Sequence, residues 1–148
     1  MPSRIAFFAF AIFLAAMSGL TTACGSAAPA ETQPLTMAQL HDMPAEVQAA
    51  PVAVQDAYRF AAANPDILGA IPCYCGCGPI GHTSNYDCYW QVPGPDGTIA
   101  FDAHALGCKI CVDITADAMR LTAEGESPGA IKDFVDTAYG RYGPSNMP

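Results

Sequence analysis

Basic residues are scarce in this chain of 148 residues, where six Lys and Arg stand against fourteen Asp and Glu and the formal net charge is −8. Proteins that bind nucleic acids present a basic surface to the phosphates, so we expect no nucleic-acid partner. The sequence also contains no internal repeat, no Ser-His-Asp order, no phosphate-binding glycine loop and no paired-carboxylate motif. These absences leave the cysteines and histidines as the candidates for a chemical function.

An apolar run long enough to span a membrane is missing from the N-terminus. The run from Ile5 to Ala16 is shorter than the ~20 residues that a spanning helix needs, and Ser18-Gly19 follows it. Arg4 precedes the run and small residues lead up to Ala23-Cys24, which together match the plan of a secretory signal. We therefore predict a signal peptide over residues 1–23 and an exported mature protein.

The residues around Cys24 resemble a bacterial lipobox, with small residues before the cysteine and Gly-Ser after it. Thr21 occupies the position where leucine is usual, and Leu20 lies one place too early. We predict that Cys24 is acylated and anchors the protein to the membrane, facing the extracytoplasmic space, because more than one acyl chain holds stably. Secretion without an anchor is the alternative. Residues 24–36 lack an apolar period and are predicted to form a flexible tether.

The remaining residues, 37–148, are predicted to fold as one small, mainly α-helical domain of about four helices around a Cys-rich loop. Apolar residues recur at helical spacing from Val52 to Ala61, where Val54, Ala57, Tyr58 and Ala61 are predicted to share one apolar face. The spacing recurs from Ile110 to Leu121. Asn64-Pro65 ends the first of these helices and begins a short helical turn.

A last helix and a tail are predicted after these. Ser127-Pro128 supplies an N-cap followed by proline at the first helical position, and Gly140 ends the helix. The tail, Arg141–Pro148, is predicted to be frayed. The buried stripe of the last helix is predicted to be Ile131, Phe134, Val135 and Ala138.

The loop covers residues 70–101, which are rich in Gly, Pro, Cys, Asn and Asp. A short β-hairpin is predicted in it, with strands at Tyr89–Val92 and Thr98–Phe101 across the turn Pro93–Gly97. Aromatic side chains are predicted to wall the loop, namely Tyr74, Tyr86, Tyr89 and Trp90.

Six cysteines and two histidines lie between Cys73 and Cys111. Two Cys-x-Cys steps bring three sulfurs close together, and Gly76 and Gly78 let the backbone turn so that they converge. Thiolates and imidazole are soft ligands, which favour Cu(I), Zn(II) or iron–sulfur clusters over Mg or Ca. Six thiolates exceed the four ligands of one structural zinc ion. The candidate metal ligands are Cys73, Cys75, Cys77, His82, Cys88, His104, Cys108 and Cys111.

Two other interpretations of the cysteines stay open. Cys108 and Cys111 are placed at the start of a helix, where the helix dipole favours thiolate, and this suits thiol–disulfide exchange as well as metal capture. However, no βαβ pattern precedes them, as thioredoxin-like proteins would require. Alternatively, three disulfides or a zinc ion staple an exported interaction module. Three alternating cysteines would then each need a separate, distant partner.

The segment Ile71–Gly78, which reads IPCYCGCG, resembles the PCYCGC-motif family of exported bacterial lipoproteins. Gly81–Cys88, Ala57–Pro65 and His104–Ile114 are similar to that family as well, so the resemblance covers about residues 40–140. It implies export, a lipid anchor and a role in the handling of metal, particularly copper. It brings no settled activity.

We therefore predict an extracytoplasmic protein that sequesters or delivers Cu(I) rather than catalyses a reaction. The excess of thiolates favours Cu(I) over zinc, which is the alternative ion. Besides the membrane, the expected partner is a protein that donates or accepts copper. The core ligands are predicted to be Cys73, Cys75, Cys77, Cys108 and Cys111, with Cys88, His82 and His104 as further members.

Overall fold

The structure is a computed structural model that describes residues 32–91 and 99–148. The predicted signal peptide, Cys24 and the predicted tether up to residue 31 lie outside the described residues, as does the turn Pro93–Gly97. No helix in the described part of the chain is both long and apolar enough to cross a membrane.

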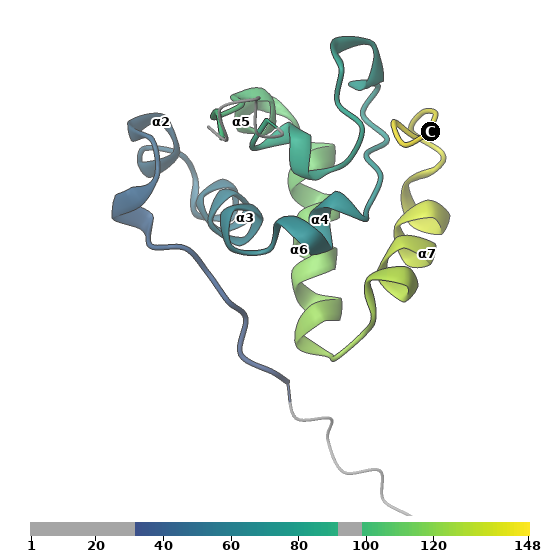
Figure 1. The fold of residues 1–148 in the computed structure, drawn as a ribbon, viewed down its shortest axis with the longest axis horizontal. Helices are drawn as coiled ribbons and strands as arrows, with labels where there is room; N and C mark the ends of the chain where they lie inside the picture. Colours follow the sequence, from purple (N-terminus) through teal and green to yellow (C-terminus); the bar gives the residue numbers. More distant parts are fainter. Residues whose placement is uncertain (1–31, 92–98) are drawn as a thin grey trace, which may run out of the picture. The chain divides into compact units, whose positions relative to one another are not determined.

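The described residues are mainly α-helical, as predicted, and contain no β-strand. Three long helices and three short ones form where about four were predicted, and α6 packs against both α3 and α7 (Figure 1). The α-helices are α2 (Ala45–Gln48), α3 (Val52–Ala63), α4 (Pro65–Gly69), α5 (His104–Gly107), α6 (Lys109–Ala123) and α7 (Pro128–Tyr139). The 3-10 helices are η1 (Leu40–Asp42), η2 (Gly78–Ile80) and η3 (Tyr86–Cys88).

Helix α3 turns its predicted apolar face into the core. Ala57, Tyr58 and Ala61 are buried there, and so is Phe60, which lies outside the predicted stripe. Asn64 ends the helix as predicted, and its side-chain amide donates to the Phe60 carbonyl at 2.8 Å. Burial of such side chains supplies most of the stability of a helix of this length.

Helix α7 begins and ends where predicted. The Ser127 hydroxyl accepts a hydrogen bond from the Ala130 backbone N–H at 3.2 Å, and Gly140 is the C-cap residue at the end of the helix. Ile131 and Val135 are buried, but the prediction that Phe134 is buried was wrong, because 38% of it is exposed. Its ring lies at the edge of the buried face, under the Arg120 guanidinium at 5.4 Å.

Val92 and Thr98, the inner ends of the predicted hairpin strands, also lie outside the described residues, and the described parts of the two strands form an antiparallel bridge between Trp90 and Phe101. Beside it, the Gln91 backbone N–H donates to the Ala100 carbonyl at 2.8 Å. Aromatic packing holds this region to the core, since the Tyr58 ring lies 4.9 Å from that of Tyr89 and 5.5 Å from that of Phe101.

The C-terminal tail is ordered against the Cys-rich loop, so the prediction that it is frayed was wrong. The Asn146 backbone N–H donates to the Cys73 carbonyl at 3.1 Å, and its side-chain oxygen accepts from the Cys73 N–H at 2.6 Å. A Cβ atom at Gly143 would lie 3.0 Å from the Tyr74 carbonyl oxygen, so the close approach of the tail needs glycine there.

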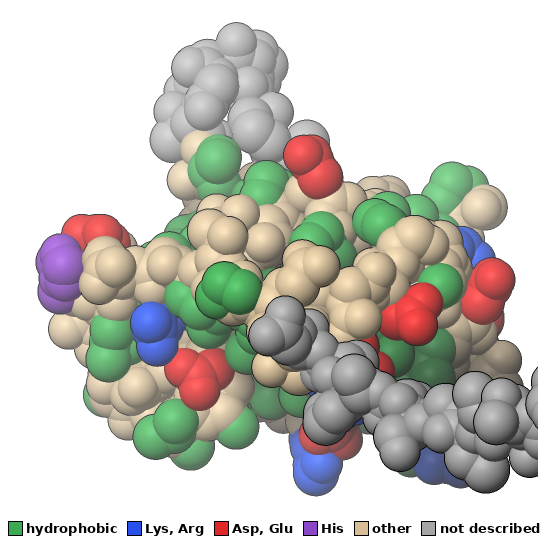
Figure 2. All heavy atoms as spheres, turned by 90° about the horizontal axis from the view of Figure 1, so that it is seen from below, with side chains coloured by type: hydrophobic (Ala, Val, Ile, Leu, Met, Phe, Trp, Pro, Cys, Tyr) green, Lys and Arg blue, Asp and Glu red, His purple; other side chains and the backbone are tan. Residues whose placement is uncertain are grey.

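Most basic side chains of the described residues are paired with acidic ones. Figure 2 shows one face, on which basic side chains lie beside acidic ones and are interspersed with apolar groups. The ion pairs of the described residues include Arg59–Asp56, Lys109–Asp113, Arg120–Asp117, Arg120–Glu124 and Lys132–Asp136.

Candidate metal centre

Four segments of the chain bring the cysteines together. Residues 73–77 lie in the loop between α4 and η2, and Gly76 has a φ of 83°, the left-handed conformation that favours glycine. Cys88 ends η3 and His104 begins α5. Cys108 is the N-cap residue of α6, and Cys111 lies in the first turn of that helix, as predicted from its spacing.

The donor atoms form two groups of four, within each of which all atoms lie within 4.8 Å of one another. We call these groups the inner set and the outer set. The inner set is Cys73, Cys75, Cys77 and Cys88, and the outer set is Cys75, His104, Cys108 and Cys111. The Cys75 sulfur belongs to both, so the sets meet at one shared donor.

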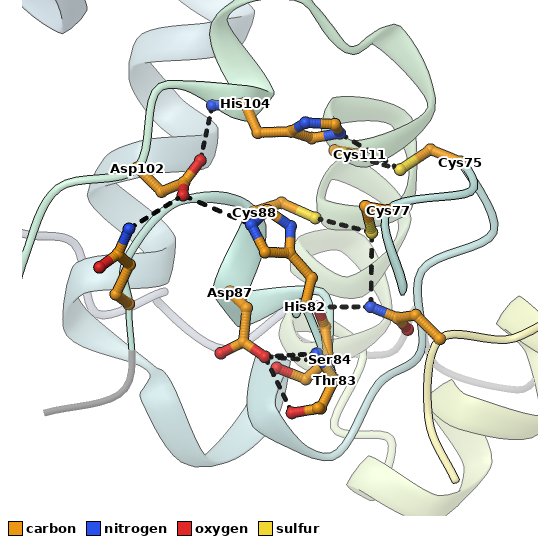
Figure 3. Close-up of polar contacts among 12 residues, drawn as sticks. Cys75, Cys77, His82, Thr83, Ser84, Asp87, Cys88, Asp102, His104 and Cys111 are labelled. Carbon is orange, nitrogen blue, oxygen red and sulfur yellow. Dashed lines mark hydrogen bonds and ion pairs between the residues drawn. The ribbon is translucent and has the colours of Figure 1, made fainter. Parts of the chain in front are cut away.

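The spacing of the donors suits a soft metal ion. The Cys77 and Cys88 sulfurs are 3.8 Å apart, and the Cys75 sulfur lies 3.3 Å from Nε2 of His104 (Figure 3). The Cys111 sulfur lies 3.6 Å from that of Cys75. Four sulfurs placed tetrahedrally at ~2.3 Å from a zinc-sized ion would be about 3.8 Å apart. Small movements of the side chains therefore suffice to hold an ion.

All six cysteines of the described residues carry free thiols. The Cys111 sulfur lies 3.5 Å from that of Cys73 as well as 3.6 Å from that of Cys75. One sulfur thus contacts two members of the Cys-x-Cys-x-Cys segment, whereas a scaffold of three disulfides needs a separate partner for each. The described residues therefore form a thiol cluster rather than a disulfide scaffold.

The thiols of the cluster ionise differently. Hydrogen bonds from neighbouring thiols, chiefly Cys111, hold the pKa of Cys73 far below its ordinary value, and one from Cys111 lowers the pKa of Cys108 to about 5. Burial raises the pKa of Cys75, and hydrogen bonding to Cys73 raises the pKa of Cys77. Hydrogen bonding to Cys108 likewise raises the pKa of Cys111. Thiolates thus lie beside protonated thiols, and an entering cation displaces protons.

His82 lies behind the outer set rather than within either group. Its Nε2 is 3.4 Å from Oδ2 of Asp102, and its ring meets the His104 ring edge-on, with the centroids 5.2 Å apart. Asp102 also accepts the backbone N–H of His104 at 2.8 Å (Figure 3). His82 and Asp102 therefore orient His104, whose Nε2 faces Cys75.

Tyr89, which was predicted to wall the loop, forms a buried polar network beside the cluster with Thr115 and Asn85, for which no role was predicted. The Tyr89 hydroxyl donates to the Cys111 carbonyl at 2.9 Å and lies 2.7 Å from the Thr115 hydroxyl. Thr115 in turn donates to Oδ1 of Asn85 at 2.8 Å, and all three side chains are fully buried. Thr115, a polar residue on the otherwise apolar buried face of α6, is the sequence signal for such a network, because buried polar groups need partners.

Two further side chains fix the loop between Cys77 and Cys88. Oδ2 of Asp87 accepts the backbone N–H groups of Thr83 at 2.7 Å and Ser84 at 3.1 Å (Figure 3). The Asn146 side-chain amide donates to the Ser84 carbonyl at 3.0 Å and to the Cys77 sulfur at 3.5 Å.

Comparison with family models matches residues 17–148 to a family described as "Protein of unknown function with PCYCGC motif". Comparisons with curated proteins and with solved structures found no significant match.

Proposed function

The chain belongs to the family of proteins with the PCYCGC motif, and we propose that it binds Cu(I) outside the cytoplasm, for sequestration or delivery. The observation that carries this proposal is the pair of four-donor sets that share the Cys75 sulfur. A shared thiolate bridges two ions, which is the means by which a few cysteines hold several soft ions close together.

The donor chemistry supports a soft ion. The two sets contain six sulfurs and one imidazole nitrogen, and no carboxylate oxygen takes part in either. Ions such as Mg²⁺ and Ca²⁺ prefer oxygen ligands, whereas thiolates select Cu(I), zinc and iron–sulfur clusters. Cys73, Cys88 and Cys111 are 0% exposed, and exclusion of water protects a cuprous centre from oxidation.

Zinc is the second candidate, and the composition of the two sets favours it. Cys₄ and Cys₃His are the ligand sets of structural zinc sites, and the inner and outer sets have these compositions. With zinc bound, the centre would stabilise the fold without exchanging its ions.

Thiol–disulfide exchange at Cys108 and Cys111 remains the catalytic alternative, and the low pKa of Cys108 suits it. The contacts of the Cys111 sulfur with Cys73 and Cys75 favour metal binding instead, because a second cysteine of a redox pair must be free to attack the first.

The proposed location follows from the N-terminal residues. A signal peptide over residues 1–23 and acylation of Cys24 would hold the domain at the membrane surface, on the extracytoplasmic side. There it would receive copper from, or pass it to, a partner protein that carries copper.

Elemental analysis of the protein, purified without oxygen, tests the proposal together with a count of free thiols before and after the metal is removed. We expect more than one equivalent of copper, with the thiols unreactive until the copper is stripped. Two zinc ions that Cu(I) does not displace would support the structural role instead. No metal and three disulfides would contradict both.

Matched variants make the test specific. Replacement of Cys73, Cys75 and Cys77 together by Ser is expected to abolish copper binding. Cys24→Ser makes the same chemical change outside both donor sets and is expected to leave the copper content unchanged. Equal copper in the triple variant and in the wild type would contradict the assignment.

A further inference from the structure

Building on the proposed metal binding, we infer that the two donor sets have different roles. The outer set takes up and releases the ion that is exchanged with other molecules, and the inner set retains its ion. The inference comes from unequal access to the two sets and from the residues that close one of them.

Access differs because the ligands are buried to different degrees. Cys73, Cys77 and Cys88 of the inner set are 0%, 2% and 0% exposed. His104 and Cys108 of the outer set are half-buried and reach the surface. A competing ligand must touch the ion before it can remove it, so the outer ion is attacked first.

A cavity of about 320 Å³ leads to the outer set beside Cys108. Gly107, which precedes Cys108, carries no side chain that would block the approach. Cys108 itself lines the cavity, so a thiol-bearing molecule in the cavity would lie beside that ligand. The lining of the cavity includes Val54, Leu106, Gly107, Cys108, Lys109 and Val112.

The C-terminal tail closes the inner set. Asn146 is tied to the backbone of Cys73 through both its main chain and its side chain, at 3.1 and 2.6 Å. Its amide also donates to the Cys77 sulfur at 3.5 Å. Next to Cys73, the Tyr74 hydroxyl donates to Oδ1 of Asp136, which lies on α7 before the tail, at 2.7 Å. Movement of the inner ligands away from an ion would break these contacts.

The exchange step is a substitution of ligands without oxidation or reduction. The sulfur of an incoming thiolate forms a bond to the outer ion while the bond from the Cys108 sulfur breaks. The incoming thiol gives its proton to solvent, and Cys108 leaves as a thiolate. The bonds from His104, Cys111 and Cys75 to the outer ion then break as further sulfur ligands of the incoming molecule take their places. Cys111 takes up a proton from solvent, and Cys75 keeps its bond to the inner ion.

The test is the rate at which a chelator removes Cu(I) from the full-length, copper-loaded protein under nitrogen. Bathocuproine disulfonate serves as the probe, because its copper complex is coloured. We expect two phases of release from the wild type, a fast one and a slow one. Cys108→Ser should remove the fast phase, and Cys88→Ser should remove the slow one. His104→Gln provides a second variant of the outer set and should also remove the fast phase.

The tail provides an independent variant. Asn146→Ala is expected to speed the slow phase about tenfold and to leave the fast phase unchanged, since outer contacts of a ligand are typically worth about 10- to 100-fold in metal affinity. Arg141→Ala, at the start of the same tail, serves as the control, because the Arg141 guanidinium contacts the side chain of Tyr142 within the tail itself.

The outcomes separate this inference from the proposed function. A protein that binds no copper would overturn both. Alternatively, the protein could bind copper but release it in one phase, with Cys108→Ser and Cys88→Ser changing the rate of release equally. That result would overturn only the inference of different roles. An unchanged slow phase in Asn146→Ala would overturn the role of the tail in retention.

Discussion

The inner and outer sets are built by different means. The inner ligands lie in the irregular segment 73–77 and at the end of the short η3, and the distant Asn146 and the nearby Asp87 hold the backbone of this region in place. The outer ligands, apart from Cys75, lie at the starts of α5 and α6, where helical geometry places them. Helical geometry fixes the backbone of the outer ligands, whereas the positions of the inner ligands depend more on the contacts that hold the loop.

Cys75 joins the two halves, and its replacement should have the largest effect. Cys75→Ser removes the shared donor, so we expect binding of both ions to weaken, whereas Cys88→Ser should affect the inner ion alone. Native mass spectrometry of protein loaded without oxygen counts the ions. Retention of a full set of ions by Cys75→Ser would show that the sets are independent.

The release of protons from the thiols on metal binding should affect the metal affinity almost as strongly. The pKa values of Cys75, Cys77 and Cys111 are raised, so these thiols are protonated in the metal-free protein at neutral pH and must lose protons when metal binds. Affinity should therefore rise with pH, by about tenfold per pH unit for each proton displaced. Competition with a chelator between pH 6 and pH 8 measures the slope. A flat profile would contradict this protonation state.

The polar network behind the cluster is expected to contribute to stability. Thr115→Val removes the hydroxyl that donates to Asn85 and leaves that buried oxygen without its partner, which should cost about 1–3 kcal/mol in the free energy of unfolding. Thr122→Val makes the same change on the same helix, where the hydroxyl has no partner among the described residues. Urea denaturation of both variants gives the comparison. Equal losses of unfolding free energy in the two variants would contradict a stabilising role of the network.

The smallest loss of stability is expected at Asp136 of α7, which meets the Cys-rich loop at Tyr74. Burial raises the pKa of Asp136, but hydrogen bonds from Lys132 and Tyr74 outweigh it, and the net pKa is lowered. Asp136 therefore stabilises the folded state above its unfolded pKa of about 3.9, and this contribution is lost as the pH falls through the folded value.

Asp136→Asn should cost at most about 1 kcal/mol at pH 7, because the site is partly exposed, and nothing in strong acid. Asp133→Asn, one turn earlier on the same helix, is the control. Unfolding in urea at neutral and acidic pH checks both variants. A cost that persists in acid would point to a cause other than the charge.

Local features of the site were predictable from sequence, and long-range ones were not. The convergence of Cys73, Cys75 and Cys77 follows from their spacing, and the position of Cys108 at a helix start follows from the apolar period of α6. The sharing of Cys75 depends on how α6 packs against the loop, which no local pattern encodes. Asn146 lies 73 residues from Cys73 in the chain, and nothing in its own segment indicates the contact.

We propose that two adjoining sets of soft donors hold ions through one shared sulfur. X-ray absorption at the copper edge, on protein loaded with Cu(I) under nitrogen, tests it most directly. We predict a first shell dominated by sulfur and a short metal–metal distance, which a bridging thiolate imposes. A shell of oxygen and nitrogen, or sulfur ligands without any metal–metal distance, would contradict the shared site.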